Sequence, residues 1–296
     1  MSFPDYPFTS HYAQVNGNWM HYLDEGKQNA DILLMLHGNP SWSFLFRKPV
    51  QALKENYRCL VPDHIGMGLS DKPDQIDYQH TLSNRVDDLE QLLDQLDVNK
   101  NITLILHDWG GMIGMTYACR FPDRIKRLVI TNTVAFHLPK TKKLPWQLKL
   151  SRSPLGPLLI RGLNAFCRGA VKDCVTRRPM QSDISAAYLK PYNSWKNRLA
   201  VLRFVKDIPL QAEENAYELV SNTDNNLHQF KQLPMLLCWG LKDFVFDESF
   251  LNEWIKRFPD ADVNHFEDAG HYLLEDAADE VVVLIQDFLA KNPLSH

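Results

Sequence analysis

Two acids and one histidine stand at chain positions from which they could form a nucleophilic catalytic triad. Asp108 follows the apolar run Ile102–Leu106 and precedes a pair of glycines; Asp243 and His271 come later in the chain. A carboxylate has a reference pKa of about 4, so Asp108 would be ionised near neutral pH and could attack an electrophilic carbon directly. His271, held in place by Asp243, could then act as a base that activates water or moves a proton.

The stretch around Asp108 has the pattern of a strand, a tight turn and a helix. A short apolar run suits a strand buried on both faces of a parallel sheet, and Gly110 and Gly111 allow a sharp reversal. A reactive residue at the apex of such a turn is typical of a nucleophile elbow. The apex residue here is Asp in place of Ser or Cys, and Leu106 stands where the serine pattern has Gly. A buried strand that ends in a helix-capping Asp has the same pattern.

Two further side chains could stabilise negative charge beside this nucleophile. Asn39 lies in the loop His37–Pro40, and Trp109 directly follows Asp108. The Asn39 amide and the Trp109 indole N–H are neutral donors suited to a departing anion, and the two backbone N–H groups could form an oxyanion hole. Asp247 is a second, weaker candidate for the acid that orients the histidine.

Strands and helices alternate through most of the chain and would bring these residues together. The expected elements are a hairpin over residues 12–23, strands over 32–36, 58–61, 102–106, 125–130, 235–239 and 263–266, and helices over 46–57, from 81, after 108, over 248–258 and over 274–289. This alternation implies a mostly parallel sheet with helices on both faces. Ligands bind beyond the carboxyl ends of the strands in such sheets, which is where the candidate residues would lie.

The alternation breaks between about residue 133 and residue 233. This stretch is helical in character and is divided into short segments by seven prolines, at positions 139, 145, 154, 157, 179, 191 and 209. We therefore divide the chain into a first core part (1–133), an inserted helical cap (134–233) and a second core part (234–296).

Composition and charge favour a soluble globular enzyme. The 296 residues are 45% hydrophobic and 23% charged, which is ordinary for this class. Five scattered cysteines favour buried free thiols in a reducing compartment over disulfides. The N-terminal segment lacks signal-peptide features, and no apolar run approaches the roughly 20 residues that span a bilayer. We expect a cytoplasmic protein with no metal and no organic cofactor, because neither a His/Cys ligand cluster nor a dinucleotide glycine fingerprint is present.

Positive charge is concentrated in the expected cap. Residues His137–Arg178 contain ten Lys or Arg and one acid, Asp173, so this segment carries +9 and the remainder −13 of the net −4. No nucleic-acid-binding motif accompanies it. The basic residues are interleaved with apolar ones such as Leu144, Trp146 and Leu150. This pattern fits a solvated surface, or a face that docks on an acidic partner enzyme or peripherally on the anionic inner membrane.

Four motifs resemble those of the haloalkane dehalogenase branch of the α/β-hydrolases, and the resemblance extends from Tyr12 to Leu289. They are His-Gly-Asn-Pro (37–40), His-Asp-Trp-Gly-Gly (107–111), Trp-Gly-Leu-Lys-Asp (239–243) and Gly-His-Tyr-Leu-Leu-Glu-Asp (270–276). The chain is most similar to the subgroup with an Asp-His-Asp triad and an Asn–Trp pair. The resemblance implies an α/β-hydrolase fold with a cap, and it implies the same catalytic roles as above. No acid follows the strand at 125–130, which argues against the Asp-His-Glu subgroup.

Many members of this subgroup are similar to the β-lactone decarboxylase of bacterial long-chain olefin biosynthesis. That similarity implies a long-chain cis-dialkyl β-lactone substrate, a cis-olefin product and an assembly with the lactone-forming enzyme. Resemblance along the whole chain favours this activity. A haloalkane dehalogenase acting through an alkyl-Asp ester is the main alternative. An epoxide hydrolase that uses Tyr188 and Tyr192 as proton donors, and a ligand receptor on a degenerate scaffold, are weaker alternatives.

Overall fold

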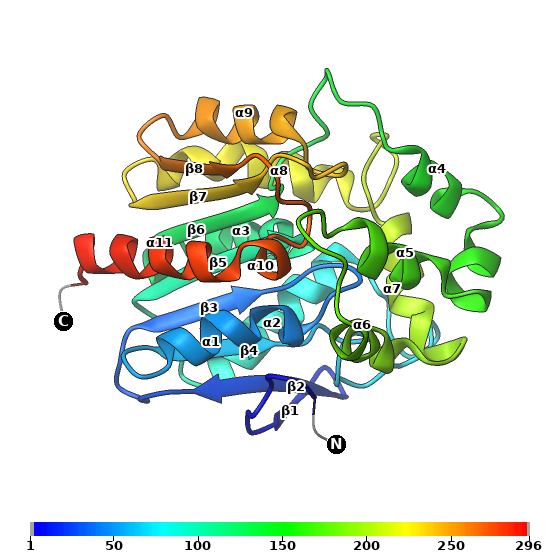
Figure 1. Ribbon diagram of the computed structural model, residues 1–296, viewed down its shortest axis with the longest axis horizontal. Coiled ribbons are helices and arrows are strands. Elements are labelled where there is room, and N and C mark those ends of the chain that lie inside the picture. The colour runs from blue at the N-terminus through cyan, green and yellow to red at the C-terminus, as the bar shows by residue number, and fades with distance from the viewer. Residues whose placement is uncertain (1–2, 295–296) are drawn as a thin grey trace.

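Eight strands form one sheet in a computed structural model that describes residues 3–294. Residues 1–2, which belong to the N-terminal segment considered above for a signal peptide, and residues 295–296 lie outside the described part. The strands are β1 (His11–Val15), β2 (Asn18–Glu25), β3 (Ile32–Leu36), β4 (Arg58–Pro62), β5 (Ile102–Asp108), β6 (Ile125–Thr133), β7 (Met235–Gly240) and β8 (Asp262–Phe266). Their order is β1-β2-β4-β3-β5-β6-β7-β8, as Figure 1 shows.

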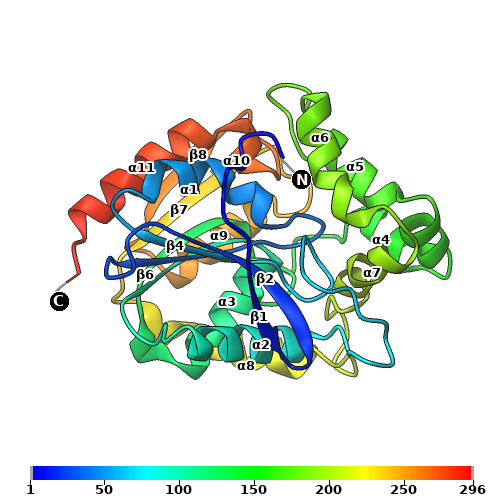
Figure 2. The ribbon, with the colours of Figure 1, turned by 90° about the horizontal axis from the view of Figure 1, so that it is seen from below.

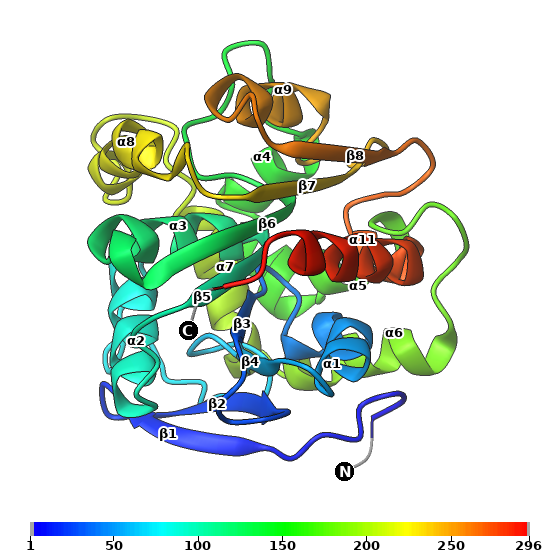
Figure 3. The same cartoon turned by 90° about the vertical axis from the view of Figure 1, so that its left-hand side faces the viewer.

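The sheet is mostly parallel, as the alternation predicts. Strand β2 pairs antiparallel with β1 and β4, and every other neighbouring pair is parallel. Strands β4, β5 and β7 are buried along their whole length. Helices α2 (Leu82–Gln95), α3 (Trp109–Arg120) and α8 (Tyr217–Asn226) cover one face, and α1 (Arg47–Leu53) and α11 (Ala278–Lys291) cover the other (Figure 3). The apolar runs are therefore strands because both of their faces are packed against helices.

Two expected helices have different limits in the structure. Helix α1 ends at Leu53, whose carbonyl accepts the N–H groups of Asn56 and Tyr57 in a turn that leads into β4. The expected last helix is broken at Ala277 into α10 (Leu273–Asp276) and α11. The side chain of Asp276 binds backbone N–H groups of other loops, and this anchors the first turn separately from the long helix.

A cap of four helices lies beyond the carboxyl ends of the parallel strands and forms one end of the molecule (Figures 1 and 2). They are α4 (Trp146–Arg152), α5 (Ala165–Asp173), α6 (Ser182–Leu189) and α7 (Leu199–Lys206). Helix α8 falls within the expected cap range but packs on α3, where the hydroxyls of Thr116 and Thr223 are 2.9 Å apart. The limits 134–233 stay a prediction, and "the cap" below means α4 to α7 with their connections.

The remaining helix of the core, α9 (Glu248–Arg257), begins at Asp247, whose side chain accepts the N–H of Ser249. All five cysteines are free, and four of them are buried. Within residues 3–294, no helix has both the length and the apolar character needed to cross a bilayer.

Candidate active site

Asp108 stands at the turn between β5 and α3 with backbone angles of φ 50° and ψ −127°. A positive φ is strained for a residue with a side chain, and such strain persists where the surrounding structure enforces it. The turn is tight enough that a Cβ on Gly110 would collide with the backbone of Leu36 in β3, and one on Gly38 would collide with Asp108 itself. This strand–turn–helix unit is the elbow that the sequence predicts.

The Asp108 carboxylate is held on one side and open on the other. The Asn39 N–H donates to its Oδ1 at 2.6 Å, and the Trp109 N–H also donates to the carboxylate. Its Oδ2 lies 3.7 Å from Nε2 of His271. The two backbone donors expected to form an oxyanion hole therefore point at the nucleophile's own carboxyl group. Oδ2 is left as the oxygen that can attack a substrate.

His271 is oriented by Asp243. Its Nδ1–H donates to Asp243 Oδ2 at 2.8 Å, while the N–H groups of Val245 and Phe246 donate to Oδ1 at 2.7 and 3.0 Å. Nε2 of His107 lies 2.8 Å from the backbone oxygen of His271. Both oxygens of Asp243 are thus occupied, which fixes the carboxylate and through it the imidazole.

Asn132 completes this arrangement and was missed in the sequence. Its amide nitrogen donates to Asp243 Oδ2 and to the Gly240 carbonyl, both at 3.0 Å, and its amide oxygen accepts the Gly240 N–H at 2.8 Å. The sequence analysis noted only that no acid stands after this strand. The available signal was a polar side chain at the carboxyl end of a buried strand, next to the strand that carries Asp243.

Burial and charge act in opposite directions on the three titratable groups. Burial raises the pKa of Asp108 despite His271 and the backbone donors, so the expectation of an unperturbed carboxylate omitted desolvation. Burial lowers the pKa of His271, but the charges of Asp243 and Asp108 outweigh it and hold that pKa above its usual value. Burial acts to raise the pKa of Asp243, and the partly positive His271 and the hydrogen bonds outweigh it and lower that pKa.

A cavity of about 360 Å³ connects these groups with the cap. Asn39, Asp108, Trp109 and His271 line its polar end. Apolar side chains line most of the remainder; among them are Met112, Phe136, Leu138, Leu144, Trp146, Leu148, Leu150, Ile160, Phe166, Val245, Phe246 and Phe250. Such a cavity suits a substrate with one reactive polar group and extended alkyl parts.

Comparison with known proteins places this fold and site. Residues 31–278 match the family model described as the alpha/beta hydrolase fold. The chain belongs to this family. It is 54% identical to the cis-3-alkyl-4-alkyloxetan-2-one decarboxylase of Shewanella oneidensis, over 97% of this chain and 90% of that protein. It is 47% identical to the protein of the same name from Xanthomonas campestris pv. campestris, over 99% of this chain and all of that protein.

Among solved structures, that of a haloalkane dehalogenase from Bradyrhizobium elkani superposes with a TM-score of 0.84 at 25% identity, covering 96% of this chain and 99% of that one. Haloalkane dehalogenases are therefore more distant relatives than the two decarboxylases. The resemblance stated from the motifs is confirmed, and so is the α/β-hydrolase fold.

The Asn39 and Trp109 side chains differ in how they are held in this α/β-hydrolase. The Asn39 amide nitrogen donates to the Val201 carbonyl of the cap at 3.2 Å. An amide nitrogen carries two hydrogens, so a second one is available toward the cavity. The Trp109 ring packs against Phe204, with ring centroids 5.4 Å apart, and also lines the cavity.

Three other candidates named from the sequence lie away from the reacting groups. Asp247 caps α9 and pairs with Lys142 at 2.7 Å, so it does not orient His271. Tyr188 donates to Glu275 at 2.6 Å, and Tyr192 donates to the Ser41 carbonyl at 3.1 Å. Neither tyrosine is part of the cavity lining, which leaves the epoxide hydrolase alternative without its proton donors.

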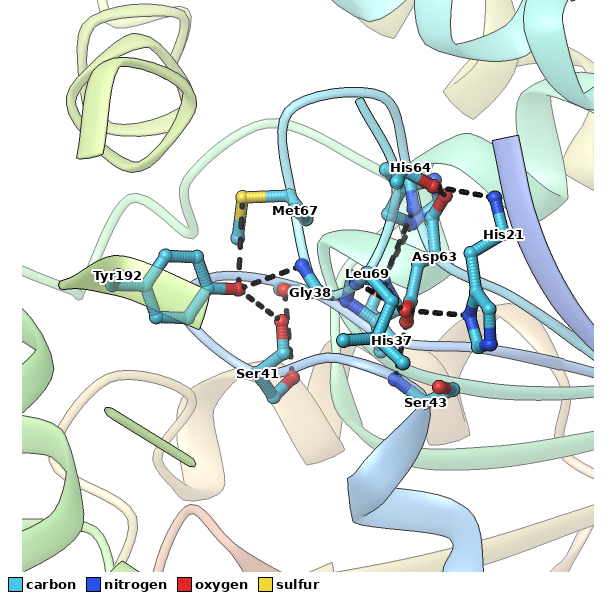
Figure 4. Close-up of polar contacts among 12 residues, drawn as sticks. His21, His37, Gly38, Ser41, Ser43, Asp63, His64, Met67, Leu69 and Tyr192 are labelled. Carbon is cyan, nitrogen blue, oxygen red and sulfur yellow. Dashed lines mark hydrogen bonds and ion pairs between the residues drawn. The ribbon is translucent and has the colours of Figure 1, made fainter. Parts of the chain in front are cut away.

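A buried polar network supports the loop that presents the Asn39 N–H (Figure 4). The carboxylate of Asp63 accepts from His21 Nδ1–H and from the Leu69 N–H, both at 2.8 Å, and from the Ser43 N–H at 2.6 Å. Burial acts to raise the pKa of Asp63, but its charge partners, His21 first, lower it to about 2. These buried contacts fix the turns after β3 and β4.

His37 and His64 continue this network to the Gly38 peptide. His37 Nδ1–H donates to the Gly38 carbonyl at 2.8 Å, and His64 Nε2–H donates to the His37 carbonyl at 2.9 Å. Burial keeps the pKa of both histidines below its usual value, so both are neutral. The peptide that ends in the Asn39 N–H is therefore held on both sides. Among residues 3–294, no three His, Cys, Asp or Glu side chains are arranged to hold a metal ion.

Proposed function

We propose that this α/β-hydrolase is a β-lactone decarboxylase that converts cis-3-alkyl-4-alkyloxetan-2-ones to cis-olefins and carbon dioxide. The observation that carries the proposal is its 54% and 47% identity to two proteins of that name, over core and cap alike. The site supports it, because an apolar cavity large enough for alkyl chains ends at a carboxylate nucleophile.

The first step is attack by Asp108 Oδ2 on ring carbon C4. The C4–O bond breaks, its electron pair leaves on the ring oxygen, and an Asp108 alkyl ester with a free carboxylate on C3 is formed. The second amide hydrogen of Asn39 and the Trp109 indole N–H are the donors that receive this carboxylate. Attack from the side opposite the departing oxygen inverts C4.

The second step releases both products. The C3 carboxylate leaves as carbon dioxide, its bonding electrons form the C3–C4 double bond, and the ester oxygen of Asp108 departs with its own pair. An anti arrangement in this step, after inversion in the first, gives the cis-olefin. No water is consumed. The N–H groups of Asn39 and Trp109 and a protonated His271 stabilise the charge that returns to Asp108.

A haloalkane dehalogenase is the second candidate, favoured by the fold and by the Asn39–Trp109 pair at the cavity end. Asp108 would then displace halide, and His271 would have to be neutral in order to take a proton from water. The two reactions thus require opposite protonation states of the same histidine, at the step that releases Asp108.

The proposed function also implies partners. A β-lactone of this kind requires an enzyme that forms it, and we propose that the chain assembles with that enzyme in the cytoplasm. Handing over a lactone with two long alkyl chains directly would avoid its release into water.

The test offers purified protein a long-chain cis-dialkyl β-lactone and a 1-bromoalkane side by side. We expect cis-olefin and carbon dioxide from the lactone, and slow or no bromide release. The Asp108→Ala variant serves as the control for uncatalysed lactone decay. Rapid bromide release with an inert lactone would reverse the assignment to the dehalogenase.

A further inference from the structure

Large apolar side chains are exposed along one part of the cap. They are Trp146 (70% exposed), Leu150 (38%), Leu155 (57%), Leu158 (57%) and Leu163 (57%). We call these five residues the α4 face. A single exposed leucine is ordinary, but a contiguous apolar patch marks an interaction site. Helix α4 lies at the outer edge of the cap in Figures 1 and 2, so this face is directed away from the sheet.

Buried neighbours fix the orientation of this face. In α4, Leu148 is buried while Trp146 and Leu150, one turn apart, are exposed. The turn Leu158–Gly162 buries Ile160. Helix α4 and this turn both pack on α7, so their exposed side chains point away from α7.

Positive charge accompanies the α4 face. Lys140, Lys143 and Lys149 are exposed and lie within six residues of Trp146 in the chain. No acid in residues 3–294 forms an ion pair with any of the three, and the sequence has no Asp or Glu between residues 124 and 172. Lys142 differs, because it is nearly buried and pairs with Asp247. Its charge is used within the protein.

The α4 face is continuous with the cavity. Trp146 and Leu150 belong to the exposed face and also line the cavity, whose other end is at Asp108. An apolar molecule can therefore move from this surface to the reacting groups past apolar side chains. A solvated surface gains nothing from this continuity, whereas a surface seated in lipid does.

We propose that the α4 face and its three lysines bind the surface of an anionic phospholipid bilayer, so that the cavity opens toward the acyl chains. A tryptophan with leucines among lysines is the composition of segments that lie in the membrane interface. Lysines next to the bilayer are attracted to anionic headgroups. The proposal concerns the place where the protein docks and holds for either reaction considered above.

The experiment is co-sedimentation of the full chain with vesicles of phosphatidylcholine alone or mixed with phosphatidylglycerol. We expect binding to the anionic vesicles that weakens as salt rises from 0.05 to 0.5 M, because exposed charges are screened. The variant Lys140→Gln/Lys143→Gln/Lys149→Gln should bind at least about tenfold more weakly at low salt. The variant Leu155→Ser/Leu158→Ser/Leu163→Ser, whose residues do not line the cavity, should also lose binding.

A matched control removes the same charge elsewhere. Lys100, Lys231 and Lys291 are exposed and lie near the opposite ends of the strands, so replacing them with Gln should leave binding unchanged. The cap lysine variant should still convert detergent-solubilised substrate, which separates failure to dock from failure of the proposed function. The proposal is overturned if wild type does not sediment with anionic vesicles, or if the cap and control variants bind alike. Self-association that disappears in the leucine variant would assign the face to a second copy of the chain.

Discussion

The cavity has two walls that are built differently. The wall formed by the strand ends is polar and fully connected: Asp108, His271 and Asp243 each have hydrogen-bond or charge partners within the core. The wall formed by the cap is apolar, with side chains such as Leu148 and Phe166. This difference indicates that the core determines the chemistry and the cap determines which alkyl groups are accepted.

The polar contacts of the cap support the same division, because they are remote from the reacting groups. Arg152 donates to the carbonyls of Val205, Lys206 and Ile208 and pairs with Glu214. These contacts tie α4 to the end of α7. The cap is therefore held at its outside and is left apolar where it meets the substrate.

Removal of the nucleophile should have the largest effect on the core wall. Asp108→Ala eliminates the group that forms the ester, and we expect turnover to fall by at least roughly a thousandfold, as when other nucleophiles are removed. His271→Ala should slow release of Asp108, so the ester accumulates and appears as a mass increase on the peptide that contains Asp108. Activity of Asp108→Ala above a thousandth of wild type would contradict the assignment of both roles.

The pH profile should show the next largest effect and separates the two reactions. Asp108 must be ionised, and burial raises its pKa, so activity should rise as pH increases through that raised value. His271 has a pKa above its usual value because of Asp243 and Asp108, so its protonated form persists to a higher pH than usual. Decarboxylation through the charged form should decline as pH rises through the His271 pKa.

Hydrolysis of an alkyl ester would give the opposite trend at the alkaline limb, because the neutral histidine is then needed. The measurement is kcat against pH with the β-lactone, between pH 5 and 9. A kcat that increases through neutral pH would favour the hydrolytic alternative. The His271→Ala variant is the control, because the alkaline limb should be absent from its profile.

The comparison of the two walls also explains what could be predicted from the sequence. The apolar runs and the order of Asp108, Asp243 and His271 identify the fold and place the candidate residues at one edge of the sheet, because local pattern fixes strands and strand ends. Asn132 and Asp63 were not identified, because their roles depend on partners more than 40 residues away. The cap was recognised only as helical. Its division into α4 to α7 and the position of α8 depend on tertiary packing.

The smallest effect is expected in the cap wall, from Phe166→Ala. Phe166 is partly buried in α5 and lines the cavity. Loss of its ring should remove about 1 kcal/mol of apolar contact with a long alkyl chain, which is roughly a fivefold decrease in kcat/KM. Val171→Ala is the matched control, since Val171 is in the same helix but outside the cavity lining. The two variants are to be compared on a series of cis-dialkyl β-lactones of increasing chain length. The decrease for Phe166→Ala should grow with chain length while the pH profile stays unchanged, because the core wall is untouched. An equal decrease at every chain length, or a shifted pH profile, would show that the two walls do not divide chemistry from substrate choice.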